Sequence, residues 1–427
     1  MSFKAKIVLV ALSTALALYA VVGGLLARRT SAVAKGNPYV QLKIFNEVVK
    51  HIANDYVDEP DMGKVRIGAL RGLAEGLDPY CAYLLPEQVQ RFKPSTMTAV
   101  PFGMVVSKYA GFGYVLAVVP GSPAAQAGVK TGDIIEYVNT VATRDVSLYE
   151  VMEMLTGVAE GGSIEITVLR SGRTKGEKLT LKPGAFQSLV TSRMETPDTG
   201  YIKVGLLGRG KAEQVMAAVR QLQQRGAQKL ILDLRESAHG ELSEAVALAS
   251  IFVPSGVVAR TIGAGNTVTA LVAQPGAVTF EGKLVVLTDR STAGPAEAVA
   301  AAVRDHQRGE VVGEKTFGAG SEQALFPLRD GSALLLTTRR YAPAAGKSFM
   351  EEPVKPSVEV KVAVVEPSIP DVDAEALPSV DTPAEETKKA MPPSEDVILK
   401  RALEILKGES KQARQPATPT VALPKAA

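Results

Sequence analysis

A glycine-rich stretch, residues 313–323 with the sequence GEKTFGAGSEQ, has the composition of a loop that holds its backbone tightly around something. Three glycines fall within eight residues: Gly313, Gly318 and Gly320. Glycine lets a backbone approach a phosphate, line a catalytic cleft or turn a corner. The spacing alone leaves these three roles open, and the surrounding elements have to decide between them.

The composition narrows the classes of chemistry. The 427-residue chain is 46% hydrophobic and 22% charged, which is typical of a folded protein of two or three domains. Its formal charge of +3 comes from 48 basic and 45 acidic residues with no block of lysines, so a nucleic-acid partner is not expected. Cys81 is the single cysteine, which rules out a disulfide within the chain. The three histidines are far apart in the sequence: His51, His239 and His306. We therefore expect no metal site and no cofactor.

The first 35 residues contain a long apolar run. Residues 7–27 carry no charge over 21 positions, enough to cross a bilayer core of about 30 Å at about 1.5 Å per residue. Lysines precede this run and Arg28 and Arg29 follow it, so the segment 1–35 is predicted to be an uncleaved membrane anchor. A cleaved signal peptide is the alternative, because AVA at 32–34 resembles a cleavage site.

Two segments then have helical periodicity. Apolar residues recur every three or four positions over 40–57 and again over 63–76, before the turn LDPY. This pattern predicts a small helical module over residues 36–96. His51 lies on the polar flank of its first helix and is expected to be solvated.

Short β-rich runs separated by glycines occupy residues 97–184, with one helical stretch at 147–155. The sequence PGSPAAQAGVKTGDIIEYVN at 120–139 resembles the PDZ domain. PDZ domains add a peptide strand to a sheet edge and capture its terminal carboxylate on backbone amides. The resemblance places the peptide-binding loop at four residues: Phe102, Gly103, Met104 and Val105. An ordinary turn before a strand is the alternative interpretation.

Strands and helices alternate over residues 185–365. Continuous apolar strands between amphipathic helices predict a largely parallel sheet covered on both faces. Residues 366–427 are rich in Pro, Ala, Glu and Lys, a composition that favours disorder, apart from a helix predicted at 395–408. That helix has an apolar face which could dock on the body of the protein or on a partner.

The order of these segments resembles the carboxyl-terminal processing proteases, also called tail-specific proteases. The resemblance is carried by LDPYCAYL, the PDZ turn, LILDLR, EAVALASIFVP, VVGEKTFGAGSEQALFPLRDGSALLLTTRRY and ALEIL. It implies an α/β fold with a helical N-terminal module, a PDZ domain and a tail-specific-protease core. It also implies a serine endopeptidase in which a serine at a helix start attacks the peptide carbonyl and a buried neutral lysine accepts its proton.

Both residues of this Ser-Lys dyad are missing. The family sequence Gly-Ser-Ala-Ser-Ala-Ser-Glu corresponds to STAGPAE at 291–297, which puts Gly294 at the nucleophile position. The family loop Thr-Phe-Gly-Lys-Gly corresponds to TFGAG at 316–320, which puts Ala319 at the lysine position. Ala319 follows Gly294 by 25 residues, the family separation, so the two alignments support each other. Gln323 retains the glutamine found four residues after the lysine.

The oxyanion region also departs from the family pattern. Asp-Leu-Arg-x-Asn-Pro-Gly-Gly is replaced by DLRESAHG at 233–240, with His239 before Gly240. An oxyanion hole depends on preorganised N–H groups, so a histidine in place of a glycine argues against a working hole.

Other side chains could in principle replace the dyad. Ser291 and Lys315 are 24 residues apart, and hydroxyl groups also lie at Thr292 and Ser321. Ser291 would sit about one turn too early, and Lys315 need not face the cleft. Gly294 and Pro295 suit a helix cap and a first helical position, so the start of the helix is predicted to be kept without its nucleophile.

The sequence thus predicts an inactive pseudoprotease that binds protein C-termini or partner proteins. An active endopeptidase with a displaced Ser or Thr nucleophile is one alternative, and a scaffold that associates with itself or with an active relative is another. By resemblance, the protein is placed in the bacterial cell envelope, with a single inner-membrane anchor and its body in the periplasm.

Overall fold

The computed structural model describes residues 38–170, 175–362 and 396–408, with no side-chain description before residue 41. The chain divides into two units after Gly72, so the second unit begins inside the predicted helical module. The first unit contains α2 (Pro38–Asp55) and most of α3 (Met62–Glu75), close to the two predicted helices. In α2, His51 is exposed and its Nδ1 lies 2.6 Å from the Asp55 carboxylate.

The predicted membrane anchor lies outside the described residues. Within the ranges that are described, the helices are all too short or too polar to cross a bilayer.

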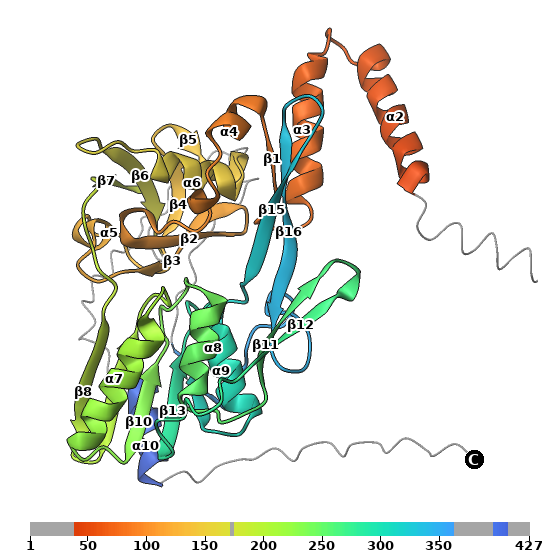
Figure 1. The fold of residues 1–427 in the computed structure, drawn as a ribbon. Coiled ribbons are helices and arrows are strands. Elements are labelled where there is room, and N and C mark those ends of the chain that lie inside the picture. The colour runs from red at the N-terminus through yellow and green to blue at the C-terminus, as the bar shows by residue number, and fades with distance from the viewer. Residues whose placement is uncertain (1–37, 171–174, 363–395, 409–427) are drawn as a thin grey trace, which may run out of the picture. The chain divides into compact units, whose positions relative to one another are not determined.

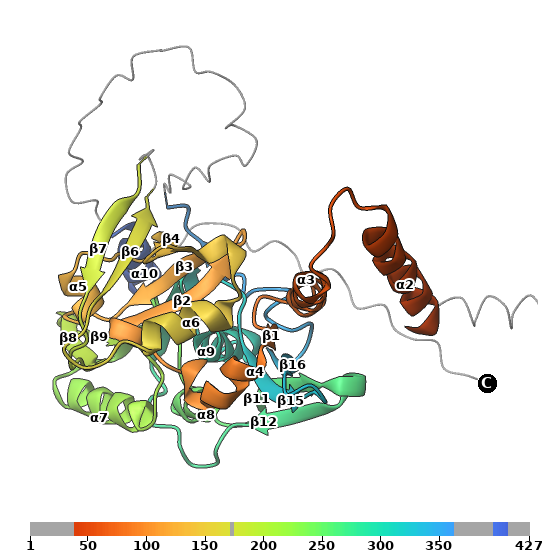
Figure 2. The same ribbon diagram turned by 90° about the horizontal axis from the view of Figure 1, so that it is seen from above.

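A six-stranded antiparallel sheet forms the PDZ region of the second unit, confirming the predicted β-rich domain. Its order is β2-β3-β4-β6-β7, with β5 beside β4. The bounds are β2 Met104–Tyr109, β3 Phe112–Val118, β4 Ile134–Val138, β5 Val141–Ala142, β6 Ile164–Leu169 and β7 Glu177–Leu181. Helix α6 (Leu148–Thr156) packs against this sheet (Figure 2) and begins at a capping box between Ser147 and Glu150.

A second six-stranded sheet forms the core, in the order β17-β14-β13-β10-β9-β8. Only β8 is antiparallel to its neighbour, so the predicted parallel core is confirmed. The bounds are β8 Val190–Thr196, β9 Thr199–Val204, β10 Lys229–Asp233, β13 Lys283–Thr288, β14 Glu310–Gly313 and β17 Val358–Glu359.

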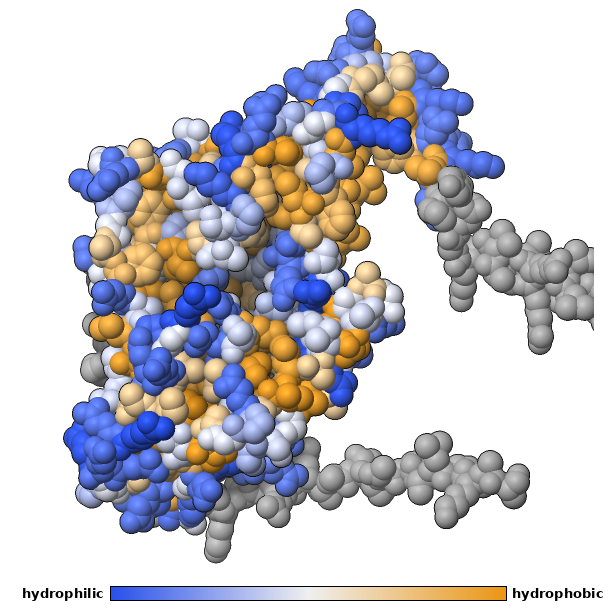
Figure 3. Space-filling view, viewed as in Figure 1, coloured by the Kyte–Doolittle hydropathy of each residue, from blue (hydrophilic) through white to orange (hydrophobic). Residues whose placement is uncertain are grey.

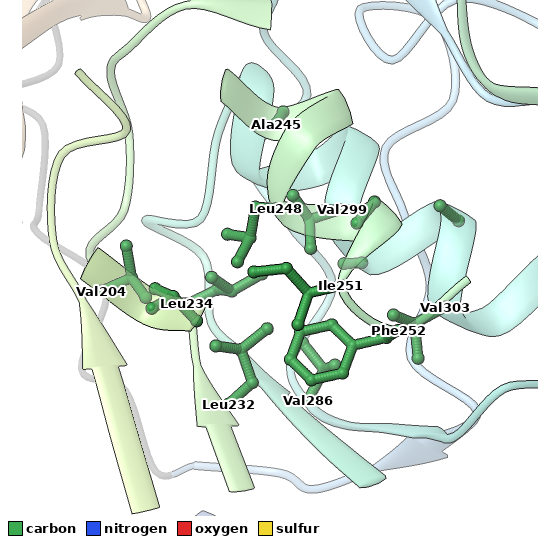
Figure 4. Close-up of a cluster of buried hydrophobic side chains, with 14 of the residues drawn as sticks. Val204, Leu232, Leu234, Ala245, Leu248, Ile251, Phe252, Val286, Val299 and Val303 are labelled. Atoms are coloured by element: carbon green, nitrogen blue, oxygen red, sulfur yellow. The ribbon is translucent and has the colours of Figure 1, made fainter. Parts of the chain in front are cut away.

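Successive residues of a strand point to opposite faces of the sheet, and the core strands are apolar on both faces. Helices cover each of these faces. Leu232 and Val286 face α7 (Lys211–Gln224), α8 (Leu242–Ser250) and α9 (Pro295–Asp305), forming the main apolar core (Figure 4). Ile231 and Val285 face the C-terminal helix α10 (Val397–Lys407) instead. The helix predicted at 395–408 is therefore present, and it docks on the body of the protein (Figure 1).

A third sheet joins segments far apart in the chain. Its order is β1-β16-β11-β12, and β15 pairs with β16. The bounds are β1 Ala82–Leu84, β11 Val257–Gly263, β12 Val268–Val272, β15 Ser321–Pro327 and β16 Ala333–Ala342. Strand β15 follows the glycine-rich loop directly, so this sheet fixes the far end of that loop. In the view of Figure 3, the surface of the second unit shows apolar patches above and below its middle.

Candidate active site

The backbone around Gly294 has the shape of a nucleophile turn. Strand β13 leads through residues 289–294 into α9, and Gly294 is the residue before the first helical position. Its φ of 59° and ψ of −119° are sterically unfavourable for any residue with a Cβ. Peptidases with a strand-turn-helix elbow hold their serine on such a strained turn so that its hydroxyl is exposed. The turn has kept this shape while its side chain is missing.

The glycine-rich loop is held against this turn by one carboxylate. Glu297, on the first turn of α9, accepts hydrogen bonds from the backbone N–H groups of Gly294 and Ala319, each at 2.8 Å. It also accepts from the Gly318 N–H at 3.1 Å and from the Thr316 hydroxyl. Glu297 thus fixes the nucleophile position and the lysine position relative to each other.

Glu297 is completely buried, and its charge state reflects two opposing effects. Burial raises its pKa to about 7 because the ionised form is desolvated, while the four donated hydrogen bonds lower the pKa. The nearby Asp289 also has a pKa raised by burial, to about 6. Both carboxyl groups therefore titrate near neutral pH in the folded protein.

Ala319 packs against the PDZ domain. It is 7% exposed and belongs to an apolar cluster with Ala293 and with Val105, Leu116 and Ala117 of the PDZ strands β2 and β3. Beside this cluster, the Tyr114 ring stacks on Phe317 of the glycine-rich loop, with ring centroids 6.2 Å apart and planes within 8°. The PDZ sheet is therefore seated directly on the lysine position.

A cavity of about 590 Å³ joins the PDZ domain to the dyad positions. Its walls include Gly294 and Ala319 from the core, Val105 and Val106 from β2, and Met152 from α6. The volume lies in the range of about 300–1,000 Å³ that is usual for ligand sites. Residues that are far apart in the sequence, including Tyr80 and Ala324, complete the walls.

The oxyanion region lines the same cavity. The His239 carbonyl accepts from the Leu207 N–H at 2.7 Å, and Gly240 forms an isolated parallel bridge with Leu207. Gly240 has φ of 150°, and a Cβ there would lie 2.2 Å from the Leu207 carbonyl oxygen, so only glycine fits. Burial lowers the pKa of the His239 ring, although a hydrogen bond with the Thr98 backbone opposes that shift. His239 is thus a neutral side chain at pH 7.

Pro295 carries no backbone N–H at this turn, although its sequence position indicated only the first residue of a helix. In a nucleophile elbow, one oxyanion donor is the backbone N–H of the residue after the nucleophile. That residue is here Pro295, the first residue of α9, and proline has no N–H. The signal was present in the sequence as a proline directly after Gly294.

The candidate replacement residues lie in different surroundings. Ser291 and Thr292 are buried and are absent from the cavity walls. Thr292 already donates toward the Leu234 carbonyl and Asp289, both at 3.0 Å. Lys315 is exposed and also lies off the cavity.

Ser321 and Gln323 do line the cavity. The Gln323 amide donates to the Ser321 hydroxyl at 2.7 Å and to the Thr337 hydroxyl at 3.3 Å. An amide N–H donor cannot remove a proton from serine, so this pair is a polar wall and not a nucleophile with its base.

The predicted peptide-binding loop is closed on itself. Phe102 and Met104 point into the PDZ core, and only Val105 lines the cavity. The Gly103 N–H donates to the Val100 carbonyl at 3.1 Å, and the Met104 N–H donates to the Pro101 carbonyl. Gly103 has φ of 83°, and a Cβ there would meet the Ser122 side chain at 2.2 Å.

Within the described part of the chain, His, Cys, Asp and Glu side chains form no group of three or more that could hold a metal ion.

These features define an α/β peptidase fold with a PDZ domain seated on its active-site loops. Residues 198–360 match peptidase family S41, and residues 114–170 match the PDZ domain. The core region thus matches the S41 peptidase model, and the chain as a whole is similar to carboxyl-terminal processing proteases.

Three relatives illustrate the similarity. The carboxy-terminal-processing protease of Bartonella bacilliformis is 27% identical over 405 residues, covering 90% of this chain and 92% of that protein. The carboxy-terminal processing protease CtpA of Bacillus subtilis is 27% identical over 74% of this chain and 68% of that protein. The solved structure of the photosystem II D1 C-terminal processing protease aligns with a TM-score of 0.60 and 25% identity, over 74% of this chain and 86% of that one.

Proposed function

We propose that this protein is a catalytically inactive member of the family that binds protein tails or partner proteins without cutting them. One observation carries the proposal: three groups required for hydrolysis are missing at one site whose backbone is intact. Gly294 supplies no hydroxyl, Ala319 supplies no amine, and Pro295 supplies no N–H.

The expected fall in turnover from each missing group supports an inactive protein over an enzyme of reduced activity. Removing a serine nucleophile lowers turnover by about a million-fold, and removal of its base adds little because the two act as a unit. Loss of one oxyanion donor is a separate effect of about 100- to 1,000-fold. The cavity, in contrast, remains large and connected to the PDZ domain.

The test is an activity measurement on the purified full-length chain. It is incubated with unfolded proteins and with short apolar-tailed peptides, beside a Ser291→Ala, Thr292→Ala, Ser321→Ala triple variant. We expect no cleavage by either protein. Cleavage by the parent chain that disappears in the triple variant would overturn the proposal.

A displaced-nucleophile endopeptidase is the second candidate function, and Ser321 is the observation that favours it because its hydroxyl lines the cavity. A Ser321→Ala single variant isolates this candidate. If peptide cleavage is detected and is lost on this one change, Ser321 is the nucleophile.

A scaffold that assembles with itself or with an active relative is the third candidate. Substitutions at Phe102 and Met104 cannot test peptide binding cleanly, because both side chains are part of the PDZ core. A Ser321→Trp change would instead fill the cavity from a half-buried position. Peptide binding that survives this change would favour the scaffold.

We further propose that residues 7–27 tether the body to the inner membrane on its periplasmic side, on the basis of the uncharged 21-residue run. Retention of the protein in the membrane pellet after an alkaline wash is the expected result. Release into the supernatant would favour a cleaved leader.

A further inference from the structure

We infer that the cavity takes an uncharged, apolar stretch of extended polypeptide and does not recognise a free terminal carboxylate. This inference rests on the proposed function, since it concerns which chains a non-cleaving binder would accept. It departs from the carboxylate capture that PDZ domains generally perform.

The electrostatics of the cavity are unfavourable for an anion. Lysine and arginine are absent from the described residues that line it, and the one carboxylate among them, Glu322, is already paired with Arg339 at 3.1 Å. His239 is the one lining group that could become cationic, and burial lowers its pKa, which keeps it neutral at pH 7. A ligand carboxylate would lose its hydration there without gaining a cationic partner.

The PDZ loop does not compensate. The N–H groups of Gly103 and Met104 already donate to carbonyls within the loop, and Pro101 has no N–H to offer. The loop is buried and packs closely on Ser122. Capture of a carboxylate by the N–H groups of Gly103 and Met104 would require these hydrogen bonds to break.

An uncharged strand, in contrast, fits the walls. Strand β2 is the end strand of its sheet, with β3 on one side, and an extended segment can add to such an edge. Val105 and Val106 of β2, Leu148 and Met152 of α6, and Leu116 of β3 present apolar surface to the cavity. Ser321 and Gln323 offer neutral hydrogen-bonding groups on the opposite wall.

The experiment is a fluorescence anisotropy titration of the full chain with three dye-labelled peptides. The first is a ten-residue peptide rich in Val, Ala and Leu with a free carboxylate, the second is the same peptide with a terminal amide, and the third is the amide with a central Asp. We expect the acid and the amide to bind within about threefold of each other, and the Asp peptide to bind at least about tenfold more weakly.

A matched pair of variants sharpens the test. Ala324 lines the cavity and is half-buried, so Ala324→Arg places a cation at its wall, and Ala324→Gln is the uncharged control of similar length. We expect Ala324→Arg to improve binding of the free acid by about five- to tenfold relative to the amide, with no such change for Ala324→Gln.

Each outcome has a distinct meaning. Binding of the free acid at least about tenfold tighter than the amide overturns the inference and leaves the proposed function standing. Binding of neither the acid nor the amide contradicts the inference and the tail-binding part of the proposed function, and leaves the binding of partner proteins. The wild-type peptide pair decides the question even if the Arg variant does not fold.

Discussion

The two positions predicted to align with the family dyad differ in their surroundings. Gly294 faces the cavity at a turn where an added Cβ would come no closer than 4.0 Å to its nearest neighbour, the Gly320 Cα. Ala319 is packed among side chains of the PDZ strands β2 and β3. The turn at Gly294 has room for a side chain and a strained backbone, whereas Ala319 is part of an apolar interface.

The difference teaches that the architecture of this site does not depend on side chains at the two dyad positions. Glu297 accepts hydrogen bonds from both positions at 2.8 Å, so their relative placement depends on that carboxylate and not on the missing side chains. The cavity and the contact between the PDZ strands and Ala319 are therefore present without a serine or a lysine at these two positions.

The first prediction asks whether the turn at Gly294 can still support chemistry. We expect Gly294→Ser with Ala319→Lys to react with a fluorophosphonate probe at background rate, because Pro295 withholds an oxyanion donor. Adding Pro295→Ala supplies that N–H and should raise the labelling rate by about 100-fold or more. The control variant carries Ala319→Lys and Pro295→Ala and keeps Gly294, so it has no serine at the turn.

Equal labelling rates with and without Pro295→Ala, in the background of Gly294→Ser and Ala319→Lys, would show that the proline does not limit the reaction. The defect would then lie in the ESAHG segment, where His239 replaces the expected glycine.

The second prediction tests Glu297 as the common support of both positions. Glu297→Ala leaves four donors, three of them buried, without their acceptor and should lower the free energy of unfolding by at least about 3 kcal/mol. Glu322→Ala is the matched control, because this partly exposed glutamate pairs with Arg339 and should cost less than about 1 kcal/mol. Urea denaturation of both variants measures the difference, and equal losses would contradict the support role.

The third prediction separates the two positions directly. The chain has no tryptophan, so a Tyr114→Trp change provides a unique fluorophore beside Phe317. In this background, Ala319→Lys should cost about 1–3 kcal/mol and shift the emission to longer wavelength as the PDZ sheet loosens. Gly294→Ser should strain its turn but leave the emission unchanged, because the PDZ side chains do not pack on it. A red shift in both variants would remove the distinction.

Much of the fold could be predicted because the buried strands and amphipathic helices carry strong periodic patterns. The core strand β13 and the terminal helix α10 are examples in which a continuous apolar face matches the structure. Strands β8 and β12 lie largely exposed at sheet ends and lack such a pattern, so they had no counterpart among the predicted elements.

The site was predictable only in part. The positions of Gly294 and Ala319 followed from sequence spacing, and the structure brings both to one cavity. The hydrogen bonds of Glu297 to the loop and the packing of Leu116 on Ala319 join segments that only the folded chain brings together, so no local pattern could indicate them.

The last prediction concerns how the stability contributed by Glu297, which accepts hydrogen bonds from both positions, depends on pH. Burial raises the pKa of Glu297 from 4.5 to about 7, so between these values the folded state holds a proton that the unfolded state has lost. Stability contributed by this group should therefore fall as the pH rises from about 4.5 to about 7, at most by about 1.4 kcal/mol per pH unit. Glu297→Gln cannot ionise, so its stability should decline less over this window, although Asp289 adds a similar slope to both proteins. Parallel stability curves for the parent and the variant would mean that Glu297 stays ionised throughout and that its four donors outweigh its burial.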